Sequence, residues 1–557
     1  MTMLLLNKLI LRTQGMVTLS PASKASRISL LTAGLLSLAV GASPFAHAAD
    51  ATVTPVQGGT LNIGLGSDTP VIDPSITAYS VAALVARNVV DSLVGQAEDN
   101  RFTPWLAERW EISDNNTRYT FHLRKDVTFS DGTKLDAAAI KYNLERILDP
   151  KTTSSYAKSL LGPIDSIATP DDNTVVISYK SPFAALLQGL SLPYLGIQSP
   201  TYLKNTPNTS NTIVGSGPFI LESFVKGSGS RLKKRPDYHW GPGYAAHTGP
   251  AYLDKIEFKY LPESSVRLGA LSSGQVQAID AVPPANAAAL KKDTRLELIT
   301  RENPGVNRVL YLNTSKGPFQ DVNVRRAFLH AVDAASATKV AFFGTLKAAE
   351  NILGPSTLYY DKSATALGGF DLKKANQLLD EAGWKTKDGQ GYRTKDGKRL
   401  TVNFVYSTGS SEAAEITLFQ AVQYQVKQAG IDVQLNPVDS GGFISRTNDN
   451  DYDIASNYFV RAEPDILRTV FDSNYIPPNG NNFSRTHSLD DKLRKAIGAS
   501  DAERQQLYSQ IQHELLDQAY AVPLFVPAYQ LGLSKKVQGI SWATNAKPNF
   551  YDVWIKP

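Results

Sequence analysis

The chain has 557 residues, of which 57 are Lys or Arg and 52 are Asp or Glu, so its formal net charge is +5. It contains no cysteine, which excludes disulfides, thiol catalysis, thiolate metal sites and a lipid anchored on an N-terminal cysteine. Hydrophobic residues make up 42% of the sequence, and the length exceeds what one hydrophobic core usually organises, so we expect at least two lobes.

The N-terminal stretch predicts a secretory signal peptide over residues 1–48. Lys24 and Arg27 precede an apolar run, 28–42, that is too short to span a bilayer and is followed by the cleavage site Ala46-His47-Ala48. Residues 1–48 carry four basic residues and no acid, so removing them lowers the net charge by four, to +1. This balance gives no compositional support for binding nucleic acid or an anionic membrane.

The first half of the mature chain alternates strand and helix patterns. Period-two alternation and apolar runs predict strands at 61–66, 119–124, 174–179 and 253–261. A helix is predicted at 81–93, and Asp136 is placed to cap another whose apolar face is Ile140, Leu144 and Ile147. Residues 266–290 are helical or loop-like, and the pattern changes at Asn303-Pro304-Gly305, where we expect the crossing into a second lobe.

The second half indicates parallel-sheet units. A strand at 308–313 precedes a helix at 322–340, and Asp371 caps a further helix that Gly383 ends. The following segments form a strand, a helix and a strand, which predicts a parallel pair with a helical crossover: 400–406, 412–429 and 431–438. Residues 489–519 are helical, and 522–526 form an apolar run between prolines. The fold class is therefore α/β.

A secreted hydrolase is the main alternative from another functional class, but its usual motifs are missing. The sequence has neither His-Glu-x-x-His nor Gly-x-Ser-x-Gly. His239 and His247 flank a Gly-Pro-Gly turn, and we interpret them as loop histidines rather than as a metal pair. The acidic run that starts at Asp449 lacks the glycine and glutamate of a calcium loop. We expect no catalytic residue, no metal and no cofactor.

Three sequence blocks occur in a fixed order along the mature chain. They are Leu106-Ala107-Glu108-Arg109-Trp110 with 119–125 and 129–133, then Gly215-Ser216-Gly217-Pro218-Phe219, then Tyr311-Leu312-Asn313-Thr314 with 317–321 and 324–327. Together they resemble the family 5 extracellular solute-binding proteins, the group that serves peptide, nickel and opine importers.

The resemblance implies a two-lobed periplasmic binding protein fold with a hinge. Lobe I would comprise 49–303, with a subdomain inserted at about 97–205; lobe II would comprise 304–525, and 526–557 would return to lobe I. Lobe closure would enclose the ligand.

The implied function is that of the periplasmic component of an ABC importer, without catalysis, which captures oligopeptides or peptide-like compounds between the lobes. An opine, a metallophore or a nickel complex is the alternative ligand on the same fold. The implied partners are the ligand and the permease subunits. We expect a monomer that binds no nucleic acid and whose mature chain does not insert into the membrane.

Two segments are the candidate ligand contacts that the resemblance implies. One follows the Asp-Pro after the first strand and comprises Ala78, Tyr79 and Ser80. The other is an extended segment of lobe II, Tyr458-Phe459-Val460-Arg461, that would pair with a peptide backbone as an added strand. For Tyr458 and Phe459, ordinary core packing is the alternative interpretation.

The second segment departs from the family's peptide-binding pattern, in which Ala-Asp-Tyr precedes Pro-Asp and the aspartate anchors the ligand's amine. This chain has Arg461-Ala462-Glu463 there. Either Glu463 replaces the aspartate after a one-residue shift, or Arg461 binds a ligand carboxylate, which suits a guanidinium fork. A surface or interlobe ion pair is the alternative role of Arg461.

Overall fold

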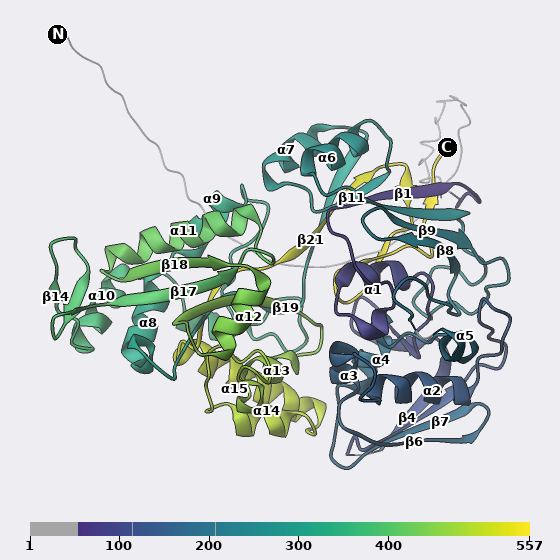
Figure 1. Cartoon of the computed structure of the whole chain (residues 1–557), viewed down its shortest axis with the longest axis horizontal. Helices are drawn as coiled ribbons and strands as arrows, with labels where there is room; N and C mark the ends of the chain where they lie inside the picture. Colours follow the sequence, from purple (N-terminus) through teal and green to yellow (C-terminus); the bar gives the residue numbers. More distant parts are fainter. Residues whose placement is uncertain (1–53, 114, 207) are drawn as a thin grey trace, which may run out of the picture. The chain divides into compact units, whose positions relative to one another are not determined.

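The computed structural model describes residues 54–113, 115–206 and 208–557 (Figure 1). The predicted signal peptide, residues 1–48, lies outside these residues. Over the described residues, no helix combines the length and the apolar character that a membrane crossing requires.

A seven-stranded sheet has the order β12-β21-β11-β1-β10-β9-β8. Its strands come from the first part of the chain and, in one case, from the C-terminal end: β1 (Thr60–Leu65), β8 (Phe219–Val225), β9 (Gly229–Lys234), β10 (Lys255–Tyr260), β11 (Ala278–Asp280), β12 (Leu296–Glu302) and β21 (Ala528–Ser534). The short helices of this region are η1 (Pro74–Ile76), α1 (Ser80–Ala86), α6 (Ser264–Ser272), η3 (Pro284–Asn286) and α7 (Ala287–Lys292).

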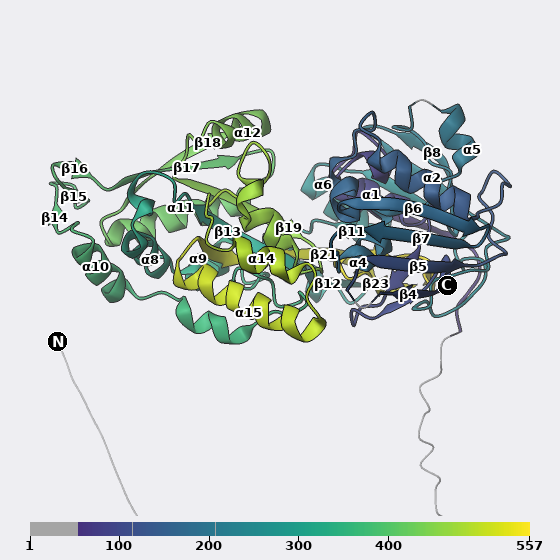
Figure 2. The same ribbon diagram turned by 90° about the horizontal axis from the view of Figure 1, so that it is seen from below.

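A four-stranded antiparallel sheet is formed by one continuous stretch of chain. Its order is β4-β5-β7-β6, as Figure 2 shows, with β4 (Ala107–Ile112), β5 (Arg118–Leu123), β6 (Ile164–Asp171) and β7 (Thr174–Tyr179). The associated elements are β2 (Val94–Gln96), β3 (Phe102–Pro104), α2 (Ala137–Leu148), α3 (Ser155–Leu161), α4 (Leu186–Ser191), η2 (Pro193–Leu195) and α5 (Pro200–Asn205). Asp136 caps α2 as predicted, because its carboxylate accepts a hydrogen bond from the Ala139 N–H at 2.9 Å.

A five-stranded sheet is built from the later part of the chain, in the order β18-β17-β19-β13-β20. Its strands are β13 (Gly305–Leu312), β17 (Thr401–Ser407), β18 (Asp432–Val438), β19 (Ile454–Val460) and β20 (Ala521–Phe525). The predicted parallel pair is confirmed: β17 runs parallel to β18, and α11 (Ala413–Gln428) connects them and packs on β18 (Figure 1).

The remaining elements surround this sheet or follow it. They are η4 (Pro318–Gln320), α8 (Val322–Ala331), α9 (Ala334–Ala341), η5 (Lys362–Leu367), α10 (Leu372–Glu381), β14 (Thr386–Lys387), β15 (Arg393–Lys395), β16 (Lys398–Arg399), α12 (Ser440–Asn448), α13 (Ile466–Phe471), η6 (Ser473–Tyr475), α14 (Asp490–Ala496) and α15 (Asp501–Asp517). Two short hairpins pair β22 (Val537–Gln538) with β25 (Trp554–Ile555), and β23 (Ser541–Trp542) with β24 (Pro548–Asn549).

Three predicted helices are shorter than the apolar periodicity suggests. The helix expected at 81–93 ends at Ala86, the segment 322–340 divides into α8 and α9, and 489–519 divides into α14 and α15. The break before α9 has a clear cause, because the Asp333 carboxylate accepts from the Ser336 N–H at 3.0 Å and so starts a new helix. A local cap has ended a helix that the periodicity alone would continue.

The core of the five-stranded sheet lies on both of its faces. Along β13, Leu310 and Leu312 belong to one apolar cluster, whereas Val309 and Tyr311 belong to another. Alternate residues of a strand point to opposite faces, so helices must cover both sides of this sheet. The seven-stranded and four-stranded sheets share a third cluster.

The chain passes between the seven-stranded and the five-stranded sheet twice. The first passage joins β12 to β13 through Asn303 and Pro304, and the second joins β20 to β21 through Val526 and Pro527. The Asn303 N–H donates to the Pro527 carbonyl at 2.8 Å, so the two passages lie side by side.

Candidate functional site

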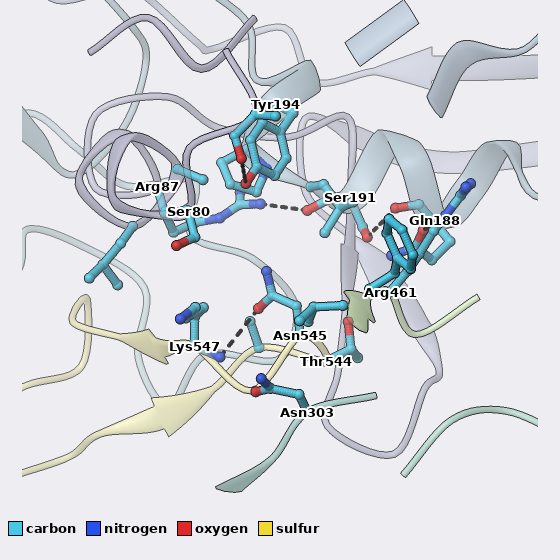
Figure 3. Close-up of a pocket in the computed structure, with 18 of the residues that line it drawn as sticks. Ser80, Arg87, Gln188, Ser191, Tyr194, Asn303, Arg461, Thr544, Asn545 and Lys547 are labelled. Carbon is cyan, nitrogen blue, oxygen red and sulfur yellow. Dashed lines mark hydrogen bonds between the residues drawn. The ribbon is translucent and has the colours of Figure 1, made fainter. Parts of the chain in front are cut away.

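A cavity of about 450 Å³ is lined by segments that are far apart in the sequence (Figure 3). They include the start of α1, the α4–η2 region, the end of β19 with the residues after it, and the β23–β24 hairpin. Small-molecule sites usually occupy about 300–1,000 Å³, so the cavity suits a compact ligand.

Six of the eight residues predicted from the sequence line this cavity. They are Ala78, Ser80, Tyr458, Phe459, Val460 and Arg461. The structure thus brings together two segments that are separated by almost 380 residues. Tyr79 lies outside the lining and is 54% exposed, and Glu463 is also outside it.

The segment that carries Ala78 and Ser80 is held in place by the buried Asp73. The Asp73 carboxylate accepts hydrogen bonds from Ser75 N–H at 3.0 Å, Ser75 Oγ at 2.7 Å, Gln198 Nε2 at 2.8 Å, Thr209 Oγ1 at 2.6 Å and Arg146 Nη2 at 3.1 Å. These donors compensate the burial of the charge and fix the chain just before α1.

The end of β19 presents one free edge to the cavity. β13 pairs with it through Val460 and Phe459, whereas β17 pairs only as far as Ala455. Across the described part of the chain, no strand occupies the other edge of β19 beyond Ala455. An unpaired edge is a template for an extended peptide backbone.

Arg461 is a buried cation that has no anionic partner among the described residues. Its side chain belongs to a residue that is only 3% exposed, and its Nε donates weakly to Gln188 Oε1 at 3.5 Å. Arg461 Nη2 and Gln188 Nε2 are buried and lack a hydrogen-bond partner within residues 54–113, 115–206 and 208–557. In that same part of the chain no carboxylate oxygen lies within 4.0 Å of its guanidinium. The alternative role considered for Arg461, an ion pair with a protein carboxylate, is therefore not formed among the described residues.

A second arginine of the lining, Arg87, is held by neutral groups of the protein. Its Nη1 donates to Ser92 Oγ at 2.9 Å and its Nη2 to the Ser191 carbonyl at 2.5 Å, and the guanidinium lies 4.9 Å from the Trp105 ring centroid. Arg87 is the C-cap of α1 and follows Ser80 by about two helical turns, so it lies on the same side of the helix, which is the signal that could have identified it.

Lys547 is the third cation of the lining, and no motif in the sequence points to it. Its Nζ lies 4.0 Å from the centroid of the Tyr529 ring. Burial lowers the pKa of Lys547 to about 8, and the negative charge of Asp280 opposes this shift. No carboxylate oxygen of the described residues lies within 4.0 Å of this ammonium group. Its position depends on the C-terminal hairpin, which brings residue 547 to the cavity.

Two asparagines of the lining offer acceptors. Asn303 Oδ1 and Asn549 Oδ1 are buried and lack a hydrogen-bond partner among the residues the structure describes. Asn549 Nδ2 donates to Ser541 Oγ at 3.4 Å, which orients its oxygen. A ligand N–H group would satisfy these acceptors.

Glu463 points away from the cavity into a buried ion pair. Its carboxylate binds Arg504 and accepts from the Asp465 N–H at 3.3 Å. Each side chain of this pair is 6% exposed. The carboxylate that could have anchored a ligand amine is thus occupied by the protein.

The lining favours recognition of an anion. Among the described residues it contains Arg87, Arg461 and Lys547 but no Asp, Glu, His or Cys. It therefore offers neither the usual ligands of a transition metal nor the side chains that most often act as a general base. Within residues 54–113, 115–206 and 208–557, no group of three or more His, Cys, Asp or Glu could hold a metal ion.

The chain is similar to known proteins over most of its length. The profile of the bacterial extracellular solute-binding proteins, family 5 Middle, matches residues 101–474. The glutathione-binding protein GsiB of Escherichia coli strain K12 is 28% identical over 492 residues, which cover 86% of this chain and 91% of GsiB.

Solved structures are also similar to this chain over most of its length. NikA from Brucella suis in complex with Fe(III)-EDTA has a TM-score of 0.79 and 26% identity, and the match covers 89% of this chain and 100% of NikA. DppA from Helicobacter pylori, an ABC transporter-associated periplasmic binding protein in complex with peptide STSA, has a TM-score of 0.73 and 25% identity over 90% of this chain. These similarities confirm the two-lobed α/β fold class predicted from the sequence.

Proposed function

The chain belongs to the bacterial extracellular solute-binding proteins, family 5, and on this basis we propose that its cavity captures a small peptide or peptide-like compound bearing carboxylates. The observation that carries the proposal is Arg461, a buried guanidinium whose Nη2 has no partner within the described residues. A buried, unpaired cation is costly, and a ligand carboxylate would compensate it with charge-assisted hydrogen bonds.

Two features support a peptide-like ligand. The free edge of β19 beyond Ala455 offers backbone groups to an extended chain, and Asn303 and Asn549 offer acceptors to its N–H groups. GsiB is named for glutathione, a peptide-like compound with two carboxylates, which agrees with a cationic lining. The cavity volume of about 450 Å³ favours a compact compound over a long peptide.

A carboxylate-rich opine, metallophore or metal complex is the second candidate. The same unpaired cations favour it, since such a compound would bring several carboxylates and no free amine to the lining. The NikA structure contains Fe(III)-EDTA, a chelate of that chemistry.

The lobes that would close on the ligand follow the sheets. We propose lobe I as residues 49–303, with its subdomain inserted at about 97–205, and 526–557, and lobe II as residues 304–525. The two sheet orders support these limits, because every strand of the five-stranded sheet lies between residues 305 and 525. The adjacent passages at Asn303 and Pro527 would serve as the hinge.

The cellular context follows from the family and from the sequence. We propose export through the signal peptide 1–48 to the periplasm, and delivery of the ligand as a monomer to the permease of an ABC importer. Ligand that bridges the lobes would raise the population of the closed state. Chemical turnover of any bound compound would instead favour the secreted hydrolase.

The ligand class is tested by mass spectrometry of whatever co-purifies with the protein, followed by thermal shift with glutathione, trialanine and Fe(III)-EDTA. A saturating ligand at a hundredfold excess over its Kd stabilises by about 2.7 kcal/mol. A preference for trialanine over both multi-carboxylate probes would contradict the proposal.

Arg461→Met separates binding from folding. We expect affinity for the bound probe to fall by about 10- to 100-fold, because a hydrogen bond to a charged group is lost. The unliganded variant should be as stable as the wild type or more so by about 1–2 kcal/mol, because an unpaired buried charge is removed. Calorimetry and urea unfolding measure the two quantities. Arg231→Met, an exposed site, is the control and should change neither.

A further inference from the structure

The cavity has a second cation, on the side opposite Arg461, that forms no ion pair with any described residue. In Figure 3, Arg461 and Gln188 lie at one side of the lining and Lys547 lies at the other. Arg87 also lines the cavity, and two of its five N–H groups donate to Ser92 Oγ and the Ser191 carbonyl at 2.9 and 2.5 Å. Among the described residues, Arg461 and Lys547 are therefore the cations of the lining whose charged groups have neither a carboxylate within 4.0 Å nor a protein hydrogen bond shorter than 3.5 Å.

The backbone at Lys547 is fixed before any ligand arrives. The hairpin of β23 and β24 is closed by a hydrogen bond from the Ala543 N–H to the Lys547 carbonyl at 2.8 Å. The Lys547 N–H itself donates to Asn545 Oδ1 at 3.3 Å. The backbone that carries this cation is thus held in place without the ligand, so no loop has to be ordered on binding.

The protein compensates the Lys547 charge only in part. The negative charge of Asp280 raises the pKa of Lys547. The Asp280 carboxylate, however, accepts a hydrogen bond from the Gly66 N–H at 2.7 Å and forms no ion pair with Lys547 among the described residues. The Tyr529 ring gives one face of the ammonium a cation–π contact. The three N–H donors of the ammonium have no hydrogen-bond acceptor in that part of the chain.

We infer that Lys547 is a second carboxylate-binding residue, so that the ligand carries two carboxylates, one bound by Arg461 and the other by Lys547, across the cavity. This inference rests on the proposed function and makes it narrower. It assigns the ligand to compact peptide-like diacids and gives Arg461 and Lys547 separate partners. A compound with a single carboxylate would leave one of the two cations unpaired and would bind more weakly.

The test uses three matched probes under reducing conditions, which cannot harm a protein without cysteine. Glutathione has both carboxylates, its C-terminal amide lacks one, and 4-aminobutyryl-cysteinyl-glycine lacks the other. We expect wild-type affinity to drop by about 10- to 100-fold for each singly charged probe, as expected for a lost charged hydrogen bond. The variants are Lys547→Met, which keeps the packing on Tyr529, and Lys536→Met as the exposed control.

The expected result is a crossed pattern in calorimetry. Lys547→Met should weaken the binding of glutathione by about 10- to 100-fold. This variant should bind glutathione and one of the two singly charged probes with equal affinity. Arg461→Met should bind glutathione and the other singly charged probe with equal affinity. Lys536→Met should bind all three as the wild type does. This pattern would assign each carboxylate to its cation.

Three other outcomes overturn the inference in different ways. If Lys547→Met binds every probe as the wild type does while Arg461→Met weakens binding, the second subsite is wrong and the proposed function stands. If neither substitution changes the affinity for any probe, both the second subsite and the proposed function are wrong. If wild-type protein binds none of the probes below a Kd of about 1 mM, or binds the singly charged ones equally well, the diacid assignment is wrong.

The pH dependence gives a readout that loss of packing would not produce. Lys547 faces Asp280 on β11 and Tyr529 on β21, and Asp280 in turn interacts with Arg267 and Glu412. Glutathione affinity should fall as the pH rises from 7 to 9.5, because the ammonium with a pKa of about 8 loses its proton. Lys547→Arg should lose less affinity than the wild type by pH 9.5, since a guanidinium stays charged while the thiol and the amine of glutathione lose their protons alike with both proteins. If the affinity of Lys547→Arg fell with pH as steeply as that of the wild type, this role would be contradicted.

Discussion

Two charged residues that are neighbours in the sequence have opposite environments. Glu463 is buried and forms an ion pair with Arg504. Arg461, two residues earlier, is also buried, but no acidic side chain among the described residues pairs with it. A buried pair is costly to break, because the remaining charge loses its compensation. An unpaired charge costs stability until something binds it. The first arrangement serves the fold, and the second suits the capture of an anion.

Glu463→Gln tests the structural half of this contrast. We expect the free energy of unfolding to fall by about 3–5 kcal/mol, because Arg504 would remain buried without its carboxylate. Urea denaturation measures it. Glu503→Gln, which breaks the exposed pair with Lys495, should change stability by less than about 0.5 kcal/mol. Loss of ligand affinity in Glu463→Gln at unchanged stability would restore Glu463 as the amine anchor.

At this scale the candidate residues were those that the family resemblance places beside a recognisable strand or motif. Arg461 comes directly after the β19 strand pattern, and it does line the cavity. Lys547 could not be found in this way, because its approach to Tyr529 depends on a five-residue turn and on the packing of two distant strands. Its ligand contact, like those of Tyr79 and Glu463, stays a prediction.

At the scale of elements, the approach of β13 to β19 depends on one glycine. Gly305 has φ +109°, and a Cβ atom there would lie 2.1 Å from the Phe459 carbonyl oxygen. Any side chain would push β13 away from the strand that lines the cavity.

Gly305→Ala should therefore destabilise by more than backbone strain alone. We expect a loss of about 3 kcal/mol or more, since a clash with main chain adds to the strain of a positive φ. Gly227→Ala is the matched control: its φ is +78° but its Cβ would meet nothing within 4 Å, so about 1 kcal/mol is expected. Equal losses in urea denaturation would show that the clash relaxes at no cost.

Elements with strong periodicity and simple ends were predictable. The unit of β17, α11 and β18 was predicted to within one residue at each end, because Gly430 stops the helix and each strand is a short segment rich in apolar residues. The break between α8 and α9 was not predicted, because the apolar stripe continues across it. At Asp333, the side-chain cap interrupts the regular helical hydrogen bonding. Local capping competes with periodicity, and the sequence alone does not show which prevails.

At the scale of the whole molecule, a ligand that contacts Arg461 and Gln188 bridges both proposed lobes. Saturating ligand should therefore favour the closed form. We expect small-angle X-ray scattering to show a smaller radius of gyration for the wild type and Lys536→Met with bound glutathione. Arg461→Met at the same ligand concentration should keep the larger value. A radius that does not change in the wild type would argue against closure.

The two passages between the sheets have a consequence for how such a protein can be recombined. The five-stranded unit is one uninterrupted stretch, 305–525, and its entry and exit are joined by the 2.8 Å hydrogen bond from Asn303 to Pro527. A module whose ends meet can be exchanged as a cassette without rerouting the rest of the chain. Grafting another protein's module between these two points would replace the Arg461 half of the specificity and leave the Lys547 half in place.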